Sequence, residues 1–181
     1  MARCAAGADP NPYLVLLETY AVNERMNQLL LGHLDPRLWL AKPPGGKGRT
    51  IAAIFAHVHN IRHKWLRLSA PHLKLPRQLD RTQRTMQQAR SALAESARRC
   101  EEMLESALFS GGVKAFVRDG WARPWPPGAA MVVYMIAHDT HHRGQVCMLA
   151  HQLGAPLPAK VTGGLWNWER LWKESGFTRP R

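Results

Sequence analysis

A stretch near the carboxyl-terminal end of the chain carries two histidines within a helical pattern of apolar residues. His138 and His142 are four residues apart, so a helix would place both on one face. At about 100° per residue, the same stripe contains five apolar side chains: Met131, Met135, Val146, Leu149 and Leu153. A metal ion between helices explains two imidazoles on an apolar face, and it predicts a third ligand from another helix.

Four long segments of the chain show apolar residues at helical spacing. They cover residues 11–33, 50–69, 80–108 and 129–153, and a shorter tail segment covers residues 165–175. Thr50 is a suitable cap for the second helix, and Asp80 with Gln83 has the pattern of a capping box for the third. Residues 113–117 fit a brief strand or an extended loop. The pattern predicts an all-α fold, a four-helix bundle of antiparallel type with an extra C-terminal helix.

Length and composition are typical of one globular domain. The chain has 181 residues and 45% hydrophobic content, enough to bury a core. We interpret residues 1–181 as a single domain, with a core over residues 11–154 and a tryptophan-rich tail over residues 155–181. No apolar run approaches the roughly 18–20 residues of a membrane helix, and the first residues lack the apolar stretch of a signal peptide. We therefore expect a cytoplasmic protein without a membrane partner.

The chain is strongly basic, with a net charge of +12. Much of the excess lies between Arg62 and Arg99, without aromatic interleaving or a known nucleic-acid reader motif. A solvated basic face explains the charge better than a nucleic-acid interface, although an anionic small molecule or an acidic partner stays open. The cysteines Cys4, Cys100 and Cys147 have no paired spacing, and we expect reduced thiols.

The second predicted helix contains three histidines that could complete the site. Its apolar arc centres between Ile61 and Trp65. On a helical wheel, His57 lies about 80° from that centre, His59 about 120° and His63 about 160°. We therefore predict that His57 faces the bundle and that His59 and His63 are solvated. Three imidazole ligands leave a coordination position open, as in catalytic sites, and they suit Zn²⁺, Fe²⁺, Ni²⁺ or Cu²⁺.

The second and fourth predicted helices resemble the signature of the DinB/YfiT superfamily. The residues that carry the resemblance are the run His138-Asp139-Thr140-His141-His142-Arg143-Gly144-Gln145 with Leu149, Leu153 and Gly154, and, in the second helix, His57, Trp65 and Leu66. Residues 20–27 of the first helix agree, and the resemblance covers most of residues 11–154.

This resemblance implies a four-helix bundle that holds one divalent metal ion (Zn, Ni or Fe) through His57, His138 and His142. It implies a metal-dependent enzyme that transfers a low-molecular-weight thiol to an electrophile, or one that performs metal-assisted hydrolysis. The alternative is a non-catalytic metal-binding module for stress response or interaction. A small-molecule substrate, a thiol as a second substrate and a homodimer are also implied, whereas the catalytic residues stay unknown.

Polar residues beside the predicted ligands are candidates for supporting roles. Gln145 lies about 20° from His138 on the wheel and could hydrogen-bond a ligand imidazole. Asp139 and Arg143 lie toward the flank and could support the ligands or pair between helices. Gly144 within a helix costs about 1 kcal/mol relative to Ala, and the close approach of a neighbouring helix is the simplest compensation.

The general base is not identified by the sequence. His141 and Glu24 are candidates, although an incidental role explains each of them better. Arg62 stands where many members of the superfamily have an acid. This departure argues against an acid-dependent role at that position, and it favours an anionic ligand.

Overall fold

The computed structural model describes residues 11–80, 85–114 and 128–177. Six α-helices occur there: α1 (Pro12–Leu31), α2 (Ile51–Ser69), α3 (Met86–Glu105), α4 (Ala129–Gln152), α5 (Ala159–Gly164) and α6 (Trp168–Glu174). Short 3-10 turns cover Pro36–Leu38 and Pro44–Gly46, and a π turn covers Ser106–Ser110. These ranges contain no strand, so the all-α prediction is confirmed. None of their helices is both long and apolar enough to cross a membrane.

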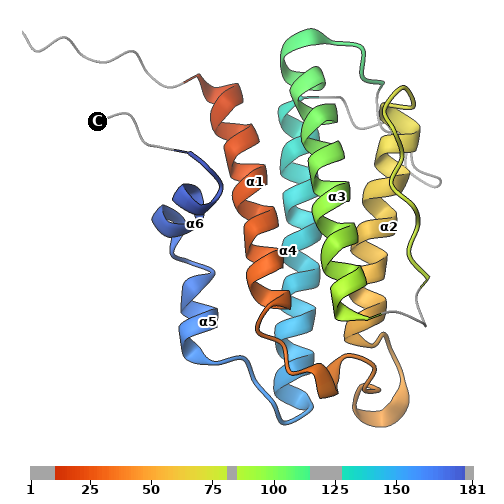
Figure 1. The fold of residues 1–181 in the computed structure, drawn as a ribbon, viewed down its shortest axis with the longest axis vertical. Helices are drawn as coiled ribbons and strands as arrows, with labels where there is room; N and C mark the ends of the chain where they lie inside the picture. The colour runs from red at the N-terminus through yellow and green to blue at the C-terminus, as the bar shows by residue number, and fades with distance from the viewer. Residues whose placement is uncertain (1–10, 81–84, 115–127, 178–181) are drawn as a thin grey trace, which may run out of the picture.

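The four long helices form a bundle in which α1 and α2 each pack against both α3 and α4. In Figure 1, α1 and α4 run in one direction and α2 and α3 run in the other. The consecutive helices α2 and α3 are therefore parallel, and the prediction of a simple antiparallel arrangement is wrong here. The segment that follows α2 returns along the length of the bundle, which allows α3 to start at the same end as α2.

Two side chains of α2 hold this returning segment. The Asn60 amide donates to the Leu79 carbonyl at 2.7 Å and accepts from the Leu79 N–H at 2.8 Å. The His59 ring nitrogens lie 2.8 Å from the Arg77 carbonyl and 2.9 Å from the Ala92 carbonyl. His59 is fully buried, and burial lowers its pKa against the opposing effect of the two carbonyls. The prediction of a solvated His59 is wrong because α3 and the returning segment cover that face of α2.

The boundaries of α1, α2 and α4 lie within two residues of the predicted ones, whereas α3 starts later than predicted. Thr85 caps α3, because its hydroxyl accepts from the Gln88 N–H and the Gln88 side chain accepts from the Thr85 N–H, both at 3.1 Å. Asp80 lies outside any helix, and the other residues of the predicted capping box, 81–83, lie outside the described residues. Residues 113 and 114 form neither helix nor strand, and the rest of the suggested strand lies outside the described part.

The interior has two main apolar clusters with buried polar groups between the helices. One cluster includes Leu30, Phe55 and Leu93, and the other includes Tyr20 and Met103. Most of their residues belong to the four long helices. A third cluster joins the tail helix α6 to α1. The bundle therefore positions the histidines, and the tail adds a layer on α1 (Figure 1).

Candidate metal centre

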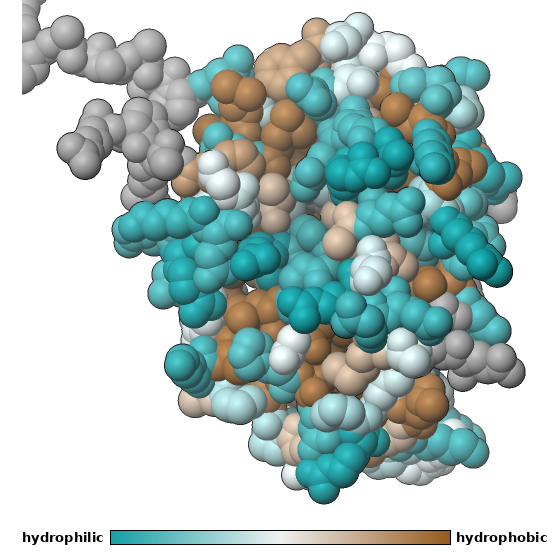
Figure 2. Space-filling view, viewed as in Figure 1, coloured by the Kyte–Doolittle hydropathy of each residue, from teal (hydrophilic) through white to brown (hydrophobic). Residues whose placement is uncertain are grey.

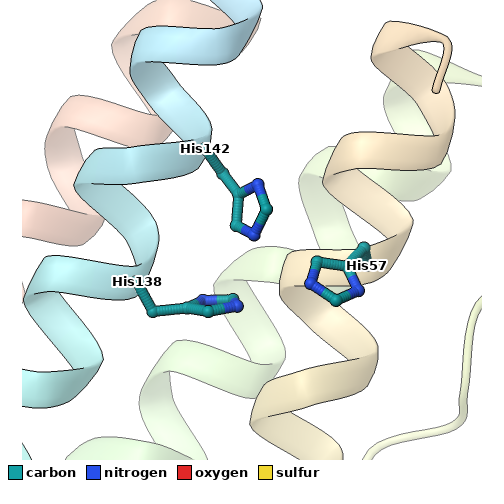
Figure 3. A group of neighbouring side chains, drawn as sticks. All are labelled: His57, His138 and His142. Atoms are coloured by element: carbon teal, nitrogen blue, oxygen red, sulfur yellow. The ribbon is translucent and has the colours of Figure 1, made fainter. Parts of the chain in front are cut away.

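The three histidines predicted as ligands lie together between α2 and α4. His57 of α2 and His138 and His142 of α4 point toward one another (Figure 3). One ring nitrogen from each lies within 4.8 Å of the other two. Two nitrogens that bind one tetrahedral ion at 2.0–2.1 Å lie about 3.4 Å apart. Small side-chain rotations would therefore bring the three nitrogens to that spacing.

The protonation of His142 suits metal binding. Burial lowers its pKa to about 4, against the opposing effect of the hydrogen bond that the ring donates to Gln145, and the nearby His138, His141 and Arg49 lower it further. The ring is therefore neutral at pH 7, which is the form that binds a metal ion. The imidazole nitrogens of the three histidines form a nitrogen-only donor set that fits Zn²⁺, Ni²⁺ or Fe²⁺.

Gln145 orients the His142 ring from the same helix. The amide oxygen lies 2.8 Å from His142 Nδ1, and the amide nitrogen lies 3.0 Å from His141 Nε2. Because a carbonyl oxygen only accepts, Nδ1–H of His142 donates to it, and the lone pair of the ring is on Nε2. This is the tautomer that a ligand through Nε2 requires.

A buried ion-pair cluster lies behind the histidines, between α1, α2 and α4. Arg62 is fully buried, and its guanidinium donates to Glu24 at 2.7 Å, to Asp139 and to the Leu93 carbonyl at 3.1 Å. Burial would raise the pKa of Asp139, but Arg62 and further donors outweigh it and hold that pKa well below its usual value. Arg62 is therefore neither part of a solvated basic face nor open to an anionic ligand. The sequence pattern did not reveal its two acidic partners.

Asn23 and Asn27 of α1 connect Asp139 to Arg143. Their amide nitrogens donate to Asp139 at 2.9 and 3.1 Å, and their amide oxygens accept from Arg143 at 2.6 and 2.9 Å. Asp139 also lies 3.6 Å from Nδ1 of His138. The two asparagines are functional candidates that the sequence reasoning missed. Their spacing of four residues on the buried face of the first helix is the signal that could have indicated them.

A cavity of about 120 Å³ opens beside the three histidines. Its other lining residues are Ile61, Lys64, Trp65, Tyr134 and His141. The Trp65 ring lies edge-on to His138, with 5.2 Å between the ring centroids. Of the two candidate general bases, His141 borders this cavity. Glu24 does not border it, and its carboxylate is paired with Arg62.

Two further expectations concern Gly144 and the cysteines. No atom lies within 4 Å of a Cβ placed on Gly144, so the prediction that a neighbouring helix approaches it is wrong. Cys100 is fully buried, which raises the pKa of its thiol to about 12, and Cys147 is half-buried. Neither belongs to the histidine cluster, and Cys4 lies outside the described residues.

Comparison with known proteins shows which family the chain belongs to. No match to the chain was found among curated proteins or among solved structures. The model of the DinB family, however, matches residues 10–170. This match covers the whole bundle, including all three histidines of the cluster and the helices that carry them. The chain belongs to the DinB family.

Proposed function

We propose that the protein is a metal-dependent enzyme that transfers a low-molecular-weight thiol to an electrophilic small molecule. The observation that carries this proposal is the meeting of His57, His138 and His142 beside a cavity. A divalent ion held by these residues would lower the pKa of a thiol or a water molecule at its open coordination position. Gln145 would keep the His142 ring in the required tautomer.

The lining of the cavity favours a thiol over water as the nucleophile. Its described lining residues include no Asp or Glu, and Nε2 of the candidate base His141 is already engaged by the Gln145 amide at 3.0 Å. A thiol has a pKa of about 8.5, against about 15.7 for water, so a thiol depends much less on a base. Trp65 and Tyr134 provide apolar walls for an electrophile, and Lys64 provides one positive charge for an anionic group of either substrate. Metal-assisted hydrolysis is the second reaction that this arrangement could support.

Metal content tests the ligand assignment. The protein is purified without a histidine tag, and bound metal is measured for the wild type, for His142→Ala and for His151→Ala. His151 is an exposed histidine on the same helix and serves as the matched control. We expect about one ion per chain in the wild type and the control, and a loss of most of it in His142→Ala. Equal metal content in all three proteins would contradict the assignment.

Activity separates the enzyme from a non-catalytic metal-binding module. The metal-loaded wild type is incubated with a panel of low-molecular-weight thiols and electrophiles, and loss of the free thiol is followed against the metal-free protein. We expect turnover that requires the metal and that His57→Ala removes. A protein that binds metal but converts no substrate in the panel would favour the module.

A further inference from the structure

A second cavity, of about 370 Å³, lies on the α1 side of α4, away from the cavity beside the histidines. It is lined by residues of α1, α4 and the tail that contains α5 and α6, and none of the three histidines lines it. Figure 1 shows the tail helices lying beside α1, and Figure 2 shows apolar surface (brown) where the tail meets the lower part of that helix. Small-molecule sites have volumes of about 300–1,000 Å³, so this cavity falls within their range.

Gly144 borders this cavity, and no contact within the protein explains a glycine there. It lies within α4, where glycine costs about 1 kcal/mol relative to Ala. A Cβ at this position would meet nothing within 4 Å. The open backbone therefore leaves room for a group from outside the chain. Gly144 also borders a depression lined by Arg49 and Gln152, so a test needs a second residue that belongs to the apolar cavity alone.

The walls of the cavity are mostly apolar and partly aromatic. Met26, Ile136 and Leu165 line it together with Trp166 and Trp168, which are 81% and 39% exposed. Tryptophans at this exposure present flat faces on which a ring can stack. A planar aromatic molecule fits such walls better than a flexible chain, because it loses less conformational freedom on binding.

The polar groups of the cavity are already engaged and do not require a charged ligand. Arg143 is the charged residue in the described lining, and its guanidinium donates to Asn23, Asn27 and Thr140. No acid lines the described part of the cavity, so nothing there pairs with a cationic ligand. Cys147 borders the cavity, and burial raises the pKa of its thiol, which suits a neutral wall rather than a nucleophile.

We propose that this cavity is a second binding site, for a neutral planar aromatic molecule of two or three rings. Its volume of about 370 Å³ is more than twice that of a 150 Å³ cavity that accepts benzene. The site is independent of the proposed metal chemistry, because the two cavities share no lining residue.

The test titrates the full chain with N-phenyl-1-naphthylamine, a neutral fluorescent probe. We expect saturable binding of one probe per chain. Gly144→Leu should weaken binding at least tenfold by filling the cavity, whereas the control Gly144→Ala should stay within twofold of the wild type. Trp166→Ala should weaken binding several-fold, and its exposed side chain makes misfolding a poor explanation. Both Gly144 variants should unfold at or above the wild-type temperature, because each favours the helix.

Alkylation of Cys147 gives a second measurement at the same place. Iodoacetamide labelling is followed by peptide mass spectrometry, which distinguishes Cys147 from Cys100 and Cys4. Bound probe should slow the labelling of Cys147 in the wild type and not in Gly144→Leu. Equal probe affinity in wild type and Gly144→Leu, or unprotected Cys147, would overturn the proposal. Sedimentation velocity gives the oligomeric state of Gly144→Leu. If that state changes while the probe affinity does not, the proposal is also overturned, and the cavity is instead a contact between copies of the chain.

Discussion

Removing Arg62 should destabilise the protein more than removing any exposed arginine. Its guanidinium is fully buried between Glu24 and Asp139, so Arg62→Met would leave two carboxylates without their cation. Loss of one partner of a buried ion pair costs about 3–5 kcal/mol in the free energy of unfolding. Urea unfolding of the metal-free protein measures this cost.

The control for this experiment is Arg98→Met. Arg98 pairs with Glu102 on the surface at 2.7 Å, and its side chain is 55% exposed. Exposed pairs contribute about 0–1 kcal/mol, so the control should unfold almost as the wild type does. Equal losses in the two variants would mean that the buried charges are solvated or neutral in solution.

Gln145 should affect metal affinity without being a ligand. Gln145→Ala removes the acceptor that fixes the tautomer of His142. Loss of such a supporting hydrogen bond lowers metal affinity about 10–100-fold. Competition with a chromogenic chelator measures the affinity, and Gln152→Ala, an exposed glutamine on the same helix, is the control. An unchanged affinity in Gln145→Ala would show that the ring is held by other groups.

At the scale of single residues, the helical period was sufficient to predict which histidines lie together. His138 and His142 are four residues apart on one helix, and His57 lies nearest of the three α2 histidines to the apolar arc of its helix. Both facts depend only on spacing within one helix, so the sequence was enough to predict them. The burial of His59 and Arg62 depends on partners from other helices. Spacing along one helix contains no information about those partners, so the predictions for these two residues were wrong.

The start of α3 can be tested through its cap. Thr85→Ala removes the hydroxyl that accepts from the Gln88 N–H, and we expect a loss of about 1 kcal/mol in the free energy of unfolding. Thr85→Ser keeps a hydroxyl at the same position and should retain most of that stability. Thermal unfolding followed by circular dichroism distinguishes the two variants. A Thr85→Ala protein as stable as Thr85→Ser would mean that the helix does not begin there.

At the scale of helices, the sequence predicted which segments are helical, but it did not predict that α2 and α3 run in the same direction. The four long helices have apolar periods that extend over many residues, so their presence follows from sequence. The parallel arrangement of α2 and α3 depends on a connector fixed by the Asn60 side chain and by the His59 ring. These hydrogen bonds join residues 18 or 19 positions apart in the sequence, and the presence of an asparagine or a histidine does not indicate such partners. The short helix α5 was missed because six residues with two glycines show no helical period.

For the molecule as a whole, α4 separates two different environments. Its His138 and His142 face α2, whereas Asp139 and Arg143 face the asparagines of α1. The tail packs on the outer side of α1 through Leu171, and no residue of its described part lines the cavity beside the histidines. The metal centre and the tail should therefore respond separately to substitution.

Leu171→Ala should loosen the tail and leave the metal centre intact. Leu171 is fully buried against Val22 and Met26, and a buried Leu→Ala substitution costs about 2–5 kcal/mol. Because α6 packs on the bundle through this small cluster and the exposed pair of Arg25 with Glu174, that cost should fall mainly on opening of the tail helices. Hydrogen exchange should rise over residues 159–177 and stay unchanged in α4, with metal content equal to that of the wild type. Glu174→Ala removes the exposed pairs of Glu174 with Arg25 and Arg170, and it should change exchange little. Faster exchange throughout α4 in Leu171→Ala would mean instead that tail and bundle unfold as one unit.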